Sequence, residues 1–266
     1  MNMYWHELKS LRKSTIIWIL SLIALAGIYF AVYPGIAADA SDFKKLLGGY
    51  PPTVRAMLGI SLDNITSILG FYSMVLSFIT LCAAIQASNL GISVISKETR
   101  GRTADFLLVK PVSRASIVSA KLLASLTVLL ITDGVYYAAV WAMASIVKTG
   151  DYSGSVFFMM NATILFVQLI FFAIGLLASV IIPKLKSVLP VSLGLVFIFF
   201  FIGTLLVTGK DDAVRFLSPF KYFDLSYILS HSAYEFPYLM AGLAIVLAAI
   251  GASYVIYVRK DIHAAS

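Results

Sequence analysis

Long apolar runs alternate with short polar connections along most of the 266-residue chain. A helix that spans a bilayer needs roughly 20 mostly apolar residues. Six runs meet this requirement, and they cover residues 15–33, 65–95, 117–147, 156–182, 188–207 and 238–258. The second and third runs are longer than a bilayer needs, so we expect these helices to tilt or to extend past it. The pattern predicts an all-α membrane protein with about six transmembrane helices.

Composition supports a membrane protein and argues against a soluble one. Hydrophobic residues make up 60% of the chain and charged residues only 12%, about half the charged fraction of a typical soluble domain. One globular core could not hide this much apolar surface from water. No stretch is polar enough for a separate soluble domain, so we expect residues 1–266 to form a single transmembrane domain.

Basic residues in the connections predict the orientation of the spans. The net charge is +7, which in a soluble protein would suggest a nucleic-acid partner. Here the basic residues lie in short segments between apolar runs, which favours the anionic membrane surface and no nucleic acid. Thirteen of the 20 Lys and Arg residues fall on the side that holds both termini. The sequence therefore predicts a multi-pass protein of the cell membrane with cytoplasmic N- and C-termini.

The segments outside the spans carry apolar faces of their own. Near the N-terminus, Tyr4, Trp5, Leu8 and Leu11 share one helical face, and basic residues occupy the other. This predicts an interfacial helix before the first span. The first apolar run exceeds the roughly 7–15 residues of a signal-peptide core, so we expect it to remain as a span. The two long outer connections, at about 34–64 and 208–237, predict short helices at the outer surface.

The motifs of catalysis and nucleotide binding are missing from the sequence. It has no H-E-x-x-H zinc motif, no G-x-S-x-G element with a plausible triad and no G-x-x-x-x-G-K-[ST] loop. The three histidines lie far apart, and the single cysteine, Cys82, excludes an internal disulfide. We therefore predict no catalytic residues, no metal site and no cofactor on this chain. If ATP drives its function, ATP and Mg must bind to a separate ATPase.

One acidic residue, Asp133, lies deep inside an apolar run. An isolated charge at the bilayer centre costs at least about 2.5–3.5 kcal/mol, so Asp133 should face other helices, a cavity or the outer boundary. We assign it, with Asn161 and Gln168, as a candidate residue of a translocation path. The alternative is a structural role, in which Asp133 is protonated or joins helices and the amides, including Gln86, hydrogen-bond between helices.

The basic connection between the second and third runs predicts a short helix with an exposed apolar side. Thr103–Leu108 reads as about two helical turns, Gly101 permits a sharp entry and Pro111 ends the helix. An ordinary basic loop facing anionic lipid would not require exposed Phe106 and Leu107. This segment is therefore typical of a docking surface for another protein.

The same connection resembles the corresponding loop of ABC-2 type permeases, the membrane subunits of certain ABC transporters. The matching residues are Glu98, Gly101, Thr103, Phe106, Leu107, Leu108, Pro111, Val112, Ser113 and Arg114, followed by Lys121. Two further matches follow the family pattern, at residues 217–224 in the last outer connection and, more weakly, at 48–52 in the first. Residues 102–105 depart from the family, where many relatives carry more acidic residues. With the six spans, the resemblance covers essentially the whole chain.

The resemblance implies a permease that works as an exporter with a separate cytoplasmic ABC ATPase and a second permease subunit, identical or related. It implies that Phe106, Leu107 and Leu108 dock into the ATPase, and that Pro111 fixes the exit of the coupling helix. It further implies that Glu98, Arg100 and Arg114 orient the loop. The alternative is an ion-gradient-driven carrier or a membrane assembly factor without an ATPase. Such a carrier would be expected to hold several charged residues mid-membrane, where the sequence offers Asp133 alone.

Overall fold

The computed structural model describes residues 2–57, 60, 62, 64–101, 114–182, 185, 187–206 and 212–259. In these residues every regular element is a helix, and six helices are long and apolar enough to cross a membrane. They are α1 (Asn2–Ala38), α4 (Ile68–Gly101), α6 (Arg114–Val147), α7 (Gly154–Ile181), α8 (Val188–Leu206) and α10 (Phe236–Arg259). The predicted all-α membrane architecture is therefore confirmed.

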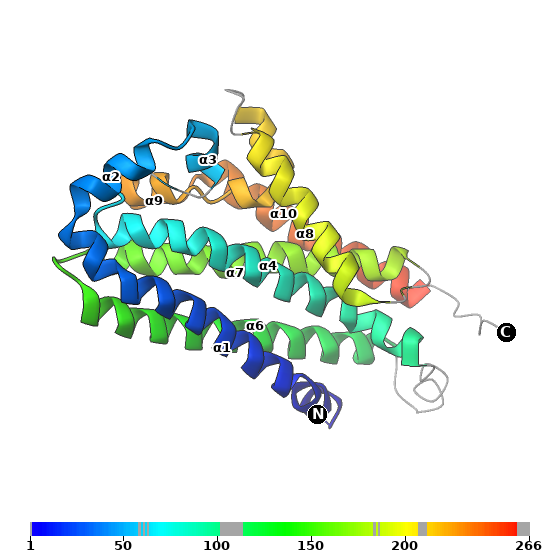
Figure 1. The fold of residues 1–266 in the computed structure, drawn as a ribbon. Coiled ribbons are helices and arrows are strands. Elements are labelled where there is room, and N and C mark those ends of the chain that lie inside the picture. Colours follow the sequence, from blue (N-terminus) through cyan, green and yellow to red (C-terminus); the bar gives the residue numbers. More distant parts are fainter. Residues whose placement is uncertain are drawn as a thin grey trace.

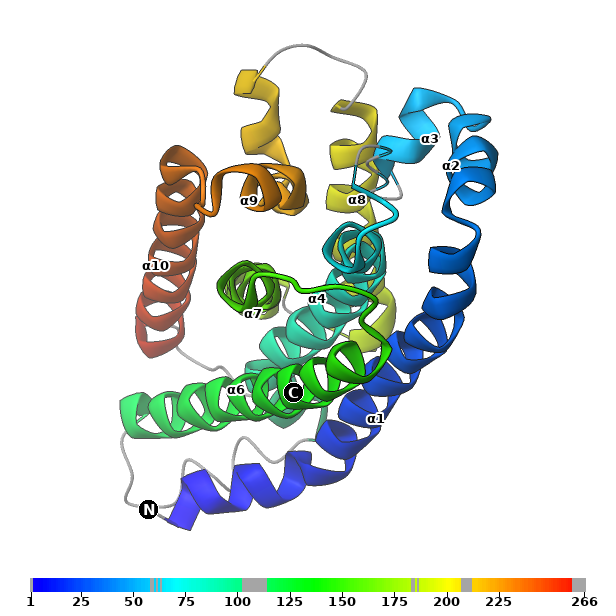
Figure 2. The same ribbon diagram turned by 90° about the vertical axis from the view of Figure 1, so that its left-hand side faces the viewer.

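The N-terminal segment is part of the first long helix and not a separate element. α1 begins at Asn2 and runs without a break into the first apolar run, and it curves along its length (Figure 2). The Tyr4 hydroxyl lies 3.0 Å from Thr127 Oγ1 of α6. Leu8 and Leu11 pack, partly buried, against the core. The apolar face that we expected at the membrane surface therefore rests in part against the protein.

The long helices surround a central pair, α4 and α7 (Figures 1 and 2). α1 and α6 lie side by side on one flank of this pair, and away from them α10 packs on α7 and α8 packs on α4. The start of α1 and the end of α10 are at the same end of the molecule, here called the terminus-bearing face. The other end, here called the opposite face, carries the short helices α2 (Ala40–Gly48), α3 (Pro52–Met57) and α9 (Leu225–His231). The two long connections thus contain short helices, as predicted.

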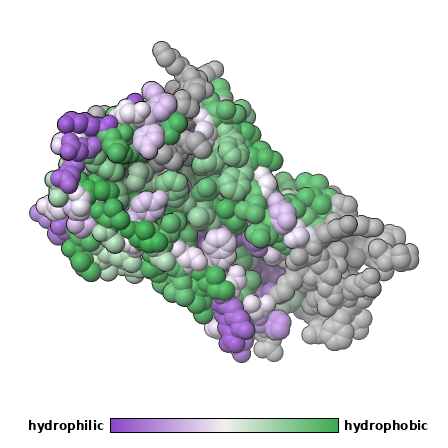
Figure 3. Space-filling view, viewed as in Figure 1, coloured by the Kyte–Doolittle hydropathy of each residue, from purple (hydrophilic) through white to green (hydrophobic). Residues whose placement is uncertain are grey.

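Burial differs sharply between the central and the flanking helices. About 61% of the apolar stretch is buried in both α4 and α7, but only 22% in α1 and α8 and 17% in α10. The flanking helices instead present large apolar side chains outward, among them Ile17 of α1 and Leu247 of α10. Hydrophobic residues cover the middle of the surface and hydrophilic residues gather at its ends (Figure 3). Lipid is the solvent that such a surface requires.

Two helix pairs form the closest contacts, α4 with α7 and α1 with α6. Small residues allow the first pair to approach closely. A Cβ added to Gly175 would lie 2.7 Å from the Ser88 carbonyl oxygen, and one added to Gly91 would collide with the Phe172 carbonyl oxygen. Close approach through glycine is a common means of helix packing in lipid. α6 contacts α4 and α7 much less than it contacts α1, so a seam separates the two pairs.

Local sequence signals fix the ends of the connection between α6 and α7. The Ser153 side chain accepts a hydrogen bond from the Val156 backbone N–H and so caps the start of α7. At the far end α7 stops at Ile181. Ile182, which precedes a proline, is extended with φ −85° and ψ 109°, because a residue before proline is driven out of the α region.

An ion pair holds the last connection of the opposite face against α10. The guanidinium of Arg215, in the 3₁₀ helix η1 (Asp212–Leu217), donates to both carboxylate oxygens of Glu235 at 3.0 and 2.5 Å. It also donates to the Lys221 carbonyl at 3.0 Å and lies 4.1 Å from the Tyr238 ring centroid. Burial disfavours the charged form of Arg215 and so lowers its pKa. The hydrogen bonds and the negative charge of Glu235 have the larger, opposite effect, so the pKa of Arg215 is raised. In the motif at 217–224, the Ser218 hydroxyl donates to the Phe199 carbonyl of α8.

Candidate functional site

The predicted docking segment lies between two described helix ends. Thr103, Phe106, Leu107, Leu108 and Pro111 fall outside the described residues.

The residues that flank this segment are described at the level of the backbone. Glu98, Arg100 and Gly101 form the end of α4, and Arg114 is the first residue of α6. Both helix ends lie at the terminus-bearing face (Figure 1). The two ends that flank residues 102–113 therefore lie on the same side of the protein.

A row of polar side chains crosses the interior near the middle of α4, α6 and α7. Gln86 of α4 donates through Nε2 to Thr132 Oγ1 of α6 at 3.1 Å, and the Thr132 hydroxyl donates to the Val128 carbonyl. Gln86, Thr132 and Gln168 are buried, and Asp133 is half-buried. The row crosses the seam, because Gln86 and Gln168 belong to the central pair and the other two residues to α6.

The Gln168 amide lies against the Asp133 carboxylate. When its nitrogen faces the carboxylate, Nε2 donates to Oδ2 at 2.8 Å and to Oδ1 at 3.2 Å. In the reverse orientation Nε2 donates instead to Gln86 Oε1 at 3.4 Å. The first orientation supplies the donors that an ionised carboxylate needs, and the second suits a protonated acid that itself donates to the amide oxygen. The charge of Asp133 and the direction of hydrogen bonding along the row are thus linked.

A second polar cluster lies further toward the opposite face, about one turn away along α6 and two turns away along α7. The Tyr72 hydroxyl donates to Asn161 Oδ1 at 2.6 Å and lies 3.2 Å from the Tyr136 hydroxyl. Asn161 Nδ2 donates to the Phe157 carbonyl of its own helix. Tyr72, Tyr136 and Asn161 are all buried. Buried tyrosine hydroxyls need partners, and this cluster supplies them across the same three helices.

The structure thus brings together part of the predicted path. Asp133 and Gln168 touch, whereas Asn161 belongs to the neighbouring cluster. Tyr72 and Tyr136 were not predicted as site residues. The available signal was a tyrosine inside an apolar run, since its hydroxyl must find a partner when it is buried.

The polar row offers contacts for a solute more than groups for catalysis. In the part of the chain that the structure describes, no group of three or more His, Cys, Asp or Glu side chains could hold a metal ion. The remaining functional groups are amides, hydroxyls and one carboxylate. They can bind polar or charged parts of a molecule, or they can join helices.

A buried lysine joins three helices near the terminus-bearing face. Lys121 of α6 is only 4% exposed. Its Nζ donates to the Val94 carbonyl of α4 at 2.9 Å and lies 4.0 Å from Glu7 Oε1 of α1. The contact fixes the start of α6 to the end of α4, the two helices that the segment 102–113 connects.

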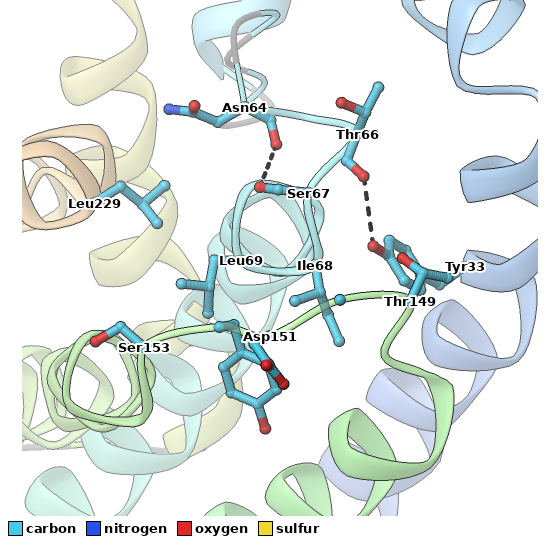
Figure 4. A pocket seen from close by; sticks show the side chains of 12 residues that line it. Tyr33, Asn64, Thr66, Ser67, Ile68, Leu69, Thr149, Asp151, Ser153 and Leu229 are labelled. Carbon is cyan, nitrogen blue, oxygen red and sulfur yellow. Dashed lines mark hydrogen bonds between the residues drawn. The ribbon is translucent and has the colours of Figure 1, made fainter.

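A cavity of about 340 Å³ opens at the opposite face between α1, α4, the connection before α7 and α9 (Figure 4). Its lining is rich in hydroxyl groups, including those of Ser67 and Tyr33. Ser67 Oγ donates to the Asn64 carbonyl at 2.7 Å, and the Tyr33 hydroxyl donates to the Thr66 carbonyl at 3.4 Å. These hydroxyls already have partners in the protein, so the cavity offers fewer free polar groups than its lining suggests.

Comparison with known proteins bears on the identity of the chain. No curated protein matches it in sequence. The model of the family described as "ABC-2 family transporter protein" matches residues 1–262, nearly the whole chain and all six apolar helices. The chain therefore belongs to the ABC-2 transporter family and is a multi-pass membrane subunit, a permease, of an ABC transporter.

Proposed function

We propose that this permease exports a substrate across the cell membrane and is driven by a separate cytoplasmic ABC ATPase. The chain has no phosphate-binding loop of its own, so nucleotide chemistry belongs to the partner, which binds ATP and Mg. The excess of Lys and Arg on the side of the termini supports a cytoplasmic terminus-bearing face.

The observation that carries the proposal is the polar row at Asp133. Asp133 lies close to the middle of α6, where a charge that faces lipid is costly. It also lies on the seam between two closely packed helix pairs, where a relative movement of the pairs would open or close it. A substrate path through the seam accounts for a carboxylate in this position.

In our proposal the ATPase acts on the seam through the segment 102–113. Asp133 is about 28 Å along the α6 axis from Arg114, at about 1.5 Å per residue. A rigid helix can carry a displacement over that length. Lys121 holds the start of α6 against α4 and α1, so these helix ends would stay in contact while the two pairs pivot about them.

The working unit in this proposal contains two permeases, identical or related, and two ATPases. The low burial of α1, α8 and α10 leaves extensive apolar surface, part of which a second permease would cover and the rest lipid.

Co-purification tests the proposal. The tagged permease is expressed with its candidate ATPase, and the variant Phe106→Asp with Leu107→Asp is compared with the unchanged chain. A matched control places aspartate at two exposed apolar positions of the opposite face, Leu46 and Tyr50. We expect the unchanged chain and the control to retain the ATPase and the variant to lose it. Equal retention by the variant would refute docking through this segment, and no ATPase with any form would refute the ATPase-driven function.

A further inference from the structure

The middle of the membrane-spanning region holds an acidic group, Asp133, with no described Lys or Arg side chain beside it. Among the described side chains, the Lys and Arg residues of the long helices lie near the terminus-bearing face, the deepest being Lys121. Lys121 is about 18 Å from Asp133 along the axis of α6. An ionised Asp133 therefore produces a local potential that favours a cation and disfavours an anion.

The carboxylate has hydrogen-bonding capacity left over. A carboxylate can accept about four hydrogen bonds. In the described part of the chain, the Gln168 amide is the hydrogen-bonding group found on Asp133. The other nearby polar atoms, Gln86 Oε1 and the Thr132 and Tyr136 hydroxyls, can all present oxygen lone pairs. The row therefore suits a positively charged partner.

Asp133 borders an apolar, outward-facing part of α6. On α6, Leu130 is 57% exposed, and a Cβ added to Gly134 would meet nothing within 4 Å. Tyr137, one turn from Asp133, adds an aromatic ring at the partly buried edge. A small alkali or divalent metal ion needs six or more oxygen ligands for a tight site. A single carboxylate with apolar and aromatic neighbours instead suits a large organic cation.

We propose that Asp133 selects lipophilic organic cations as substrates of this permease. This inference rests on the proposed function, because it assumes that Asp133 borders the translocation path. The carboxylate binds the positive centre, the exposed apolar positions of α6 accept the hydrophobic groups, and the Gln168 amide orients the carboxylate.

A pair of probes with the same shape and opposite charge tests the proposal. The full-length permease in lipid nanodiscs is equilibrated with radiolabelled tetraphenylphosphonium or with tetraphenylborate, without any ATPase. We expect saturable binding of the phosphonium and none of the borate. Equal binding of both ions would overturn the proposal, and so would the absence of binding by either ion. This comparison uses the unchanged chain and needs no variant.

Variants locate the binding. Asp133→Asn should weaken phosphonium binding at least about tenfold, a loss of 1.4 kcal/mol or more. Asp133→Glu, which keeps the charge, should retain most of it, as should Asp151→Asn at the exposed opposite face. Unchanged binding by Asp133→Asn overturns the assignment. Since no ATPase is present, failure of this assay is distinguishable from failure of the ATPase to co-purify.

Discussion

The close contact between α4 and α7 leads to a prediction about two glycines. Replacement of Gly91 or Gly175 by alanine adds a methyl group where the facing atoms are backbone. Real Cβ atoms essentially never lie under 3.0 Å from another atom, yet the Cβ at Gly175 would lie at 2.7 Å. The two helices must therefore separate by about 0.3 Å or more at this crossing, and a close-packed interior resists such a shift.

The size of the effect follows from two opposing contributions. Overpacking of a core costs about 1–3 kcal/mol, whereas glycine to alanine within a helix gains up to about 1 kcal/mol. We expect each variant to lose about 1–2 kcal/mol net, with Gly91→Ala the worse of the two because its collision is the closer. At roughly 2–4 °C per kcal/mol, the Tm of either variant should fall by several degrees.

Thermal unfolding in detergent, followed by circular dichroism at 222 nm, measures this loss. Gly251→Ala in α10 is the matched control, since a Cβ there meets nothing within 4 Å. It should leave the Tm unchanged or raise it. If Gly91→Ala and Gly175→Ala are as stable as Gly251→Ala, glycine does not set the distance between the central helices, and the reasoning fails.

Three further predictions concern other parts of the molecule. Lys121→Met should lower the free energy of unfolding by about 1.5–3 kcal/mol, the range for a buried hydrogen bond from a charged group, measured by the same thermal assay. Burial raises the pKa of Tyr234 to about 12. The folded protein therefore keeps the phenol proton where the unfolded chain loses it, so stability should fall between about pH 10 and 12. Tyr234→Phe should make this fall smaller in alkaline unfolding curves, because the contribution of Tyr234 is removed. The distance between spin labels at exposed positions Ile146 of α6 and Phe158 of α7 should change when the ATPase binds ATP. The distance between labels at Ile146 and Val32 of α1 should stay the same, because these helices belong to one pair. Equal changes for both pairs would contradict a seam between rigid helix pairs.

The six spans were predictable because lipid imposes a length and a composition that can be read directly from the sequence. The start of α1 could not be predicted in the same way. Apolar length placed it at residue 15, but the helix begins at Asn2. The preceding residues look amphipathic in part because their apolar face meets the protein, with Leu8 and Leu11 against the core. Amphipathicity alone does not distinguish a lipid surface from a protein surface.

The candidate site was predictable only in part, for a related reason. Asp133 was identifiable because a charge inside an apolar run is costly wherever it lies. The contact of Asp133 with Gln168 could not be predicted from the sequence. In uniformly apolar helices the sequence does not indicate which helix faces meet. Backbone contacts at Gly91 and Gly175 set the register of α4 against α7, and this register brings Gln86 to Gln168.

Polar contacts at the seam have a consequence for movement. Interdigitated apolar side chains resist sliding, because a displaced core loses packing throughout its contact area. Interhelical hydrogen bonds in membranes contribute only about 0.6 kcal/mol on average. The Gln168 amide can moreover turn from Asp133 to Gln86 and keep a partner in either position. Buried apolar and aromatic contacts also cross the seam, such as Phe30 of α1 on Tyr72 of α4, so the low cost of rearrangement applies to the polar row itself. The same side chains that would bind a substrate therefore make the polar row the part of the seam that rearranges most easily.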